Sequence, residues 1–130
     1  MILPKLSAAL LSMSFFGTAY ASGSLHGATT PEQWVVVSGA SHGAAAVFQA
    51  SPSDLAQHRA TAHAHLERYA REQGTALEGF DALFERGHTE GRLLVMAHSR
   101  IFRPHSQALL QGFHHDRRIR YEDMTRALRA

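Results

Sequence analysis

The sequence predicts a mainly α-helical fold, a small single-domain bundle of about five or six helices over residues 30–130. Two motifs that typically begin helices, Thr30-Pro31 and Ser51-Pro52, stand before long segments of the chain. Apolar residues recur every three or four positions through most of the chain after residue 30, as expected for one buried face of a helix. The chain has 130 residues and no cysteine, so this domain must form its core without disulfides.

Residues 1–21 have the pattern of a cleaved export signal. Lys5 is followed by an apolar run, Leu6–Phe16, and then by the small-x-small sequence Ala19-Tyr20-Ala21. The run is shorter than the ~20 residues that span a bilayer. We therefore expect cleavage after Ala21, a flexible leader over residues 22–29, no transmembrane segment in the mature chain, and a periplasmic or secreted bacterial protein.

The segment from residue 31 to about residue 49 allows two interpretations. Thr30 can cap a helix, Pro31 suits its first position, and Gln33 can complete a capping box. The run Val35-Val36-Val37 favours a strand instead, and each glycine at 39 and 43 costs a helix about 1 kcal/mol. A single helix is the favoured interpretation, and a strand, a turn and a helix remain the alternative.

The next helix is the most clearly marked one. Ser51 caps it, Pro52 takes its first position, and Gly74 stops it after Gln73. Its expected buried stripe consists of Leu55, Ala62, Leu66 and Tyr69. Leu66 and Tyr69 should lie against the preceding helix and the helix after it.

The rest of the chain is divided by glycine, proline and polar residues into shorter helices. The expected helices and breaks are, in order, a helix over 76–86 ended by Gly87, a helix from Thr89 or Glu90 that Pro104 ends or kinks, a helix over 106–113, a break at 114–116, and a basic helix over 117–129. Met96 and Met124 are expected in the core.

Residues 38–43 also resemble two enzyme motifs. Gly39-Ala40-Ser41-His42-Gly43 fits G-x-S-x-G and resembles the nucleophile elbow of serine hydrolases, while the stretch from Ser38 resembles the nucleotide-binding turn of short-chain dehydrogenases. An elbow requires a sheet that the few preceding residues do not supply. The dehydrogenases require a lysine four residues after the catalytic tyrosine, and Gln73 holds that place after Tyr69. We interpret both matches as chance and predict a protein that is not an enzyme.

The ten histidines suggest a transition-metal site only weakly. No two of them have the i,i+3 or i,i+4 spacing that places two ligands on one face of a helix. The nearest ligand pair within a helix is His63 with Glu67, and His114, His115 and Asp116 could chelate from a loop. Zinc, copper or nickel are the ions that such residues bind, so a periplasmic histidine-rich metal-binding or metal-buffering protein is the alternative function.

Positive charge is concentrated near the C-terminus. Residues 22–99 hold five arginines and eight acids, a net charge of −3, whereas residues 100–130 hold seven arginines and three acids, a net charge of +4. Arg117, Arg118 and Arg120 are the candidate anion-binding residues, unless they pair with nearby acids or with acids of residues 53–73. The predicted function is that of an exported, non-enzymatic binding or adaptor protein, whose partner is an anionic surface or another exported protein, with no specific signal for nucleic acid.

Overall fold

The computed structural model describes residues 30–129, and the expected signal peptide and leader lie outside them. The described chain is all-α: five longer helices and a one-turn helix, with no strand in this range. The elements are α2 (Pro31–Val47), α3 (Pro52–Glu72), α4 (Phe80–Ala97), α5 (Ser99–Phe102), a 3₁₀ turn η1 (Arg103–His105), α6 (Ser106–Arg117) and α7 (Tyr121–Arg129). The predicted fold class is confirmed, and none of these helices is long and apolar enough to cross a membrane.

The two helix-start motifs act as predicted. The Gln33 amide donates to Thr30 Oγ1 (3.1 Å) and the Thr30 amide donates to Gln33 Oε1 (3.2 Å), which completes the capping box. At α3, the Asp54 amide donates to Ser51 Oγ (3.1 Å). Because α2 is helical from Pro31 to Val47, the alternative of a strand and a turn over this segment is wrong.

The prediction for α4 is wrong in two respects. The sequence predicts one helix ending at Gly87 and another beginning at Thr89 or Glu90, whereas α4 is continuous from Phe80 to Ala97. It also begins later than predicted, since Gly79, with a φ of +71°, precedes its first turn. Gly87 lies in the middle of α4, where the absence of a side chain lets the helix pack against α2, and it does not end the helix.

Four glycines set the contact between α2 and α4. They occur as two pairs with identical spacing, Gly39 and Gly43 on α2 and Gly87 and Gly91 on α4. A Cβ atom at any of the four would lie less than 3.0 Å from a carbonyl oxygen of the opposite helix, a separation that real Cβ atoms essentially never show. The two backbones are therefore in direct contact, and the helices run in the same direction.

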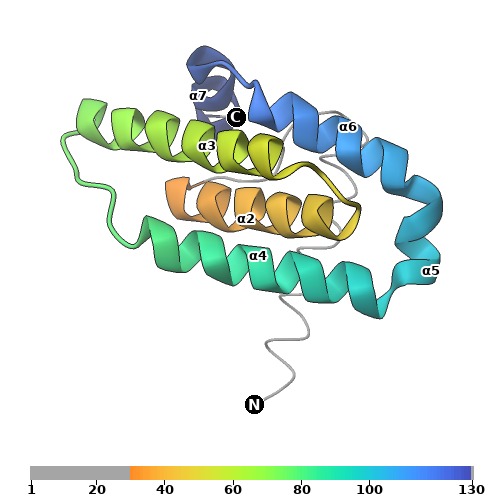
Figure 1. The fold of residues 1–130 in the computed structure, drawn as a ribbon. Helices are drawn as coiled ribbons and strands as arrows, with labels where there is room; N and C mark the ends of the chain where they lie inside the picture. The colour runs from red at the N-terminus through yellow and green to blue at the C-terminus, as the bar shows by residue number, and fades with distance from the viewer. Residues whose placement is uncertain (1–29, 130) are drawn as a thin grey trace.

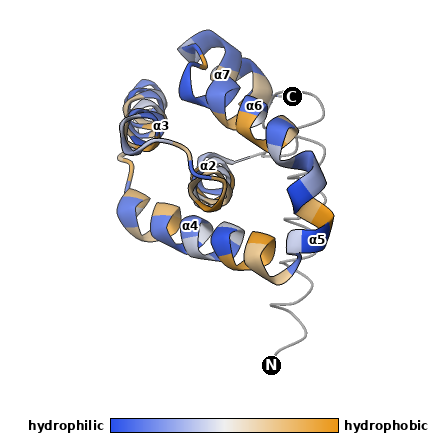
Figure 2. Cartoon of the chain, turned by 45° about the vertical axis from the view of Figure 1, so that its right-hand side comes forward, coloured by the Kyte–Doolittle hydropathy of each residue, from blue (hydrophilic) through white to orange (hydrophobic). Residues whose placement is uncertain are grey.

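Helix α2 is the central helix of the domain. It lies between α3 and α4, and α6 crosses near its other side (Figure 1). When the molecule is turned, α2 is seen nearly end-on with α3, α4 and α6 around it (Figure 2). Small and apolar residues from Trp34 to Ala45 are buried on most of its circumference. This explains why α2 lacks the polar face that an ordinary surface helix shows.

The apolar core consists of two clusters along α2. The first gathers around Trp34 and joins α3, α4 and α7; its members include Leu66, Phe84, Tyr121, Met124 and Leu128. The second lies at the other end of α2 and includes Ala44, Val95, Phe102, Leu109 and Phe113. Leu66 is fully buried and Tyr69 is packed against the first cluster, as predicted.

Three further predictions are wrong: the break over residues 114–116, the start of the last helix and the burial of Met96. Residues 114–116 do not form a break, because α6 continues through them to Arg117, and the chain turns only before Tyr121. Phe113 lies in the second apolar cluster and Arg117, one helical turn later, is held by Asp54 of α3, so contacts on both sides of residues 114–116 favour an unbroken helix. Met124 is buried as predicted, but Met96 is 53% exposed, since it lies on the side of α4 opposite the glycine contact.

Candidate functional site

Arg117, the first predicted anion-binding residue, is directed into the protein. Its side chain is 9% exposed, and its guanidinium lies 3.3 Å from Asp54 and donates to Gln57 Oε1 and to His114 Nδ1 (3.2 Å). It thus joins α6 to α3. The alternative that these arginines pair with acids of residues 53–73 is correct for Arg117, which leaves little of its charge for a partner.

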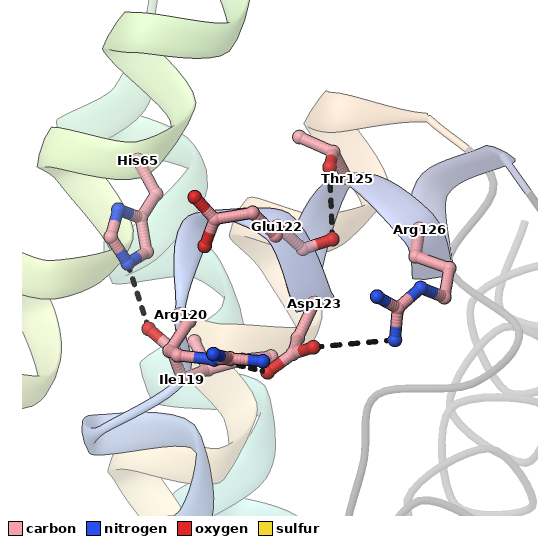
Figure 3. A network of polar contacts seen from close by, with 7 residues as sticks. All are labelled: His65, Ile119, Arg120, Glu122, Asp123, Thr125 and Arg126. Carbon is pink, nitrogen blue, oxygen red and sulfur yellow. Dashed lines mark hydrogen bonds and ion pairs between the residues drawn. The ribbon is translucent and has the colours of Figure 1, made fainter.

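Arg120 is also engaged within the protein. Its guanidinium lies 3.2 Å from Asp123, which is shared with Arg126 at 3.4 Å (Figure 3). Beside this network, His65 Nε2 lies 2.8 Å from the Ile119 carbonyl oxygen, so it must carry the proton and donate (Figure 3). Arg118 is exposed and has no ion pair among residues 30–129. Of the three predicted residues, only Arg118 is free to meet an anion.

Three of the five arginines without an ion pair among residues 30–129 lie elsewhere, where α4 meets α5; the other two are Arg118 and Arg129. Residues 91–115 contain no Asp or Glu. Within them Arg92, Arg100 and Arg103 are exposed and form no ion pair with a described residue. Seven other arginines lie within 4.0 Å of a carboxylate: Arg59, Arg68, Arg71, Arg86, Arg117, Arg120 and Arg126. Two of the seven arginines that make the C-terminal part positive, Arg100 and Arg103, thus lie at this turn.

Exposed apolar side chains accompany these arginines. Among residues 30–129 the exposed large apolar residues are Leu93 (58%), Met96 (53%) and Ile101 (55%). Leu93 and Met96 are three residues apart on the outer side of α4, and Ile101 comes next on α5, beside the buried Phe102. We name residues 92–103 the α4–α5 corner. Polar and apolar segments adjoin one another there (Figure 2).

A groove of about 640 Å³ borders the α4–α5 corner. Four residues belong to both: Val95, Met96, Ser99 and Arg103. The other side chains that line it come from the end of α2, the turn after it and α6: Val47, Phe48, Gln49, Ser106, Gln107 and Leu110. The exposed apolar surface of the corner therefore continues into a partly apolar hollow that contains one guanidinium.

The residues predicted to bind metal do not assemble into one site. His63 Nε2 lies 3.6 Å from Glu67 Oε2, and Glu67 also meets Arg71, so this pair is an exposed contact along a single helix. His115 is exposed on α6, whereas Asp116 is buried, and burial raises its pKa well above the usual value. In the described part of the chain no group of three or more His, Cys, Asp or Glu residues is arranged to hold a metal ion.

A second cluster, which the sequence did not reveal, contains three histidines from three helices. His42 Nδ1 on α2 and His88 Nδ1 on α4 are 2.9 Å apart, and the ring of His58 on α3 lies 5.8 Å from that of His42. Burial, with the neighbouring His88 and Arg59, lowers the pKa of His42 to about 4. These residues are far apart in sequence, and only the crossing of the helices brings them together.

His58 is the buried member of this cluster. It is 1% exposed, its ring lies 4.8 Å from that of Phe113, and its Nδ1 has no hydrogen-bond partner among the described residues. Burial, and then the proximity of His42 and Arg117, lowers its pKa to about 3. His58 is therefore neutral in the folded protein at neutral pH.

Ser41, the serine of the G-x-S-x-G match, lies within this same helical framework. It is 1% exposed in the middle of α2, with no strand before it in the described chain. The strand-to-helix turn that presents the nucleophile in hydrolases is thus not formed at this position. Comparison with models of known families, with curated proteins and with solved structures finds no match to this chain.

Proposed function

We propose that this chain is an exported, non-enzymatic binding protein that docks on anionic phospholipid surfaces through the α4–α5 corner. The observation that supports the proposal is the combination of three unpaired arginines with three exposed large apolar side chains in a stretch that has no acid. Arginine attracts anionic head groups, and the apolar side chains can enter the boundary between head groups and acyl chains.

The same residues set the expected strength of such binding. Each arginine near an anionic membrane contributes about 1 kcal/mol, and the contribution of partly inserted apolar side chains adds to this. Loss of all three arginines should therefore weaken binding by about 3 kcal/mol, or roughly 100-fold. The binding should also weaken with added salt, because the attraction between exposed charges is screened.

The test compares three forms of the exported protein in a vesicle flotation assay. The first is wild type, the second is Arg92→Gln/Arg100→Gln/Arg103→Gln, and the third is the matched control Arg68→Gln/Arg71→Gln/Arg86→Gln. The control removes the same charge from exposed arginines that are already ion-paired. We expect wild type and the control to float with vesicles of phosphatidylglycerol and phosphatidylcholine, and the corner variant to remain largely unbound.

A fourth variant, Leu93→Ser/Met96→Ser/Ile101→Ser, separates membrane docking from simple attraction between charges. Its arginines are intact, so it should retain binding to heparin or DNA but lose most of its binding to vesicles. If it floats as well as wild type, or if both arginine variants bind alike, docking of the α4–α5 corner on a membrane is excluded.

A further inference from the structure

His42 and His88 meet beside the glycine contact between α2 and α4. His42 precedes Gly43 and His88 comes directly after Gly87. Because the glycines allow the two backbones to touch, side chains at the edge of this contact are forced together, and the two Nδ1 atoms are 2.9 Å apart. Both imidazoles are half-buried, so the pair is accessible from solvent.

The hydrogen bonding of the pair defines which nitrogens could bind an ion. One Nδ1 must donate and the other accept, since two neutral acceptors or two donors cannot share a hydrogen bond. The Nδ1 atoms of the two rings are directed to one another, so these two nitrogens are the ones that a shared ion would meet.

The charged groups nearest to the pair come from α3 and α4. Arg59 of α3 is held by Asp81 (2.8 Å) and Glu85 (2.6 Å) of α4. The two carboxylates offset part of its charge, although at His42 the Arg59 guanidinium lowers the pKa more than Glu85 raises it. The remaining neighbours of His42 are the neutral ring of His58 and the edge of Phe84.

We propose that His42 and His88 bind one divalent transition-metal ion through their Nδ1 atoms, and that the site prefers Cu(II) to Zn(II). With metal–nitrogen bonds of about 2.0–2.1 Å, nitrogens at the observed separation subtend an angle of about 90° at the metal. That angle suits neighbouring positions of a square-planar or tetragonal ion such as Cu(II), whereas tetrahedral zinc requires nitrogens roughly 3.3 Å apart. This site differs from the metal-ligand residues predicted from the sequence.

Binding of the ion to the two histidines changes the position of one proton but not the number of bound protons. The ring that now donates through Nδ1 moves its proton to Nε2 by exchange with water, so both rings bind as neutral imidazoles and no proton is released in sum. The described chain supplies two ligands and no third. Water or a small anion completes the coordination, so the ion exchanges readily and serves in transfer or buffering rather than in stabilising the fold.

The experiment is a Cu(II) titration of the purified protein, monitored by calorimetry and by electron paramagnetic resonance. Wild type should show one site that is distinctly tighter than the rest, with a tetragonal spectrum and splitting from two nitrogens. His42→Asn and His88→Asn should each weaken this site at least about tenfold. The matched control His63→Asn removes an exposed histidine of α3 and should leave the tight site unchanged.

Two further measurements distinguish the loss of the metal site from the loss of the fold. Thermal unfolding with EDTA shows whether each variant is folded, and a nuclear magnetic resonance titration of wild type locates the ion without any substitution. Paramagnetic broadening should begin at residues next to His42 and His88. Unchanged tight binding in the two variants, broadening that begins elsewhere, or tighter binding of Zn(II) than of Cu(II) would overturn the assignment. None of these results depends on the vesicle assay.

Discussion

Replacing Gly87 with alanine will lower the free energy of unfolding by about 3 kcal/mol. The added Cβ would lie less than 3.0 Å from the Val36 carbonyl oxygen, a backbone atom that cannot move without displacing α2. In an isolated helix the same substitution would stabilise the helix by about 1 kcal/mol. The contact with α2 therefore decides whether Gly87→Ala raises or lowers the free energy of unfolding. Urea unfolding monitored by circular dichroism measures the change.

Thr89→Ala is the matched control for this prediction. Thr89 is exposed on α4 between Gly87 and Gly91, so alanine there adds no atom to the contact. We expect a change of at most about 0.5 kcal/mol for this surface substitution. If Gly87→Ala were as stable as Thr89→Ala, the direct backbone contact between α2 and α4 would be refuted.

Acid will destabilise the protein in part through His58, and His58→Leu will remove that part of the sensitivity, while His42, with a pKa lowered to about 4, keeps its own. The pKa of His58 is lowered to about 3 in the folded protein, while the unfolded chain titrates near the ordinary value of 6.5. The stabilising contribution is therefore present above pH ~6.5 and is lost as pH falls below it, because the unfolded state then binds a proton that the folded state excludes. The loss is about 1.4 kcal/mol per pH unit.

Urea unfolding with EDTA, between about pH 7.5 and about pH 4.5, tests this linkage. His58→Leu should be at least as stable as wild type at the upper pH, because the buried Nδ1 has no partner to lose. Its stability should fall less steeply with acid. The control Phe113→Leu disturbs the packing of the same imidazole without removing it, and should keep the wild-type slope. Equal slopes for wild type and His58→Leu would show that His58 is not held neutral.

Local signals predicted the starts of α2 and α3 well, but the interruptions of the later helices poorly. The caps at Thr30 and Ser51 bond to residues three positions along the chain, so the local sequence is sufficient to predict them. Glycine commonly ends a helix, but Gly87 lies within α4, where it contacts the backbone of α2. The useful signal was the repeated spacing of four, shared by Gly39 with Gly43 and by Gly87 with Gly91, which indicates two helices that fit together.

The candidate sites were harder to predict because they depend on contacts between helices. The sequence left open whether Arg117 binds an anion or pairs with an acid of residues 53–73, and α6 places it against Asp54 and Gln57. His42 and His88 are 46 residues apart, so no spacing rule joins them. The absence of acids over residues 91–115 was readable from the sequence, but only the structure showed that Leu93, Met96 and Ile101 are exposed beside the arginines.

The most direct test of membrane docking places an environment-sensitive dye at the α4–α5 corner. The chain has no cysteine, so Met96→Cys offers a single attachment point, and Gln73→Cys at the far end of α3 offers the matched control (Figure 1). With phosphatidylglycerol vesicles, emission from position 96 should shift to the blue as the dye enters the membrane boundary, while position 73 stays unchanged. No shift at position 96, or an equal shift at both positions, would contradict docking through this corner.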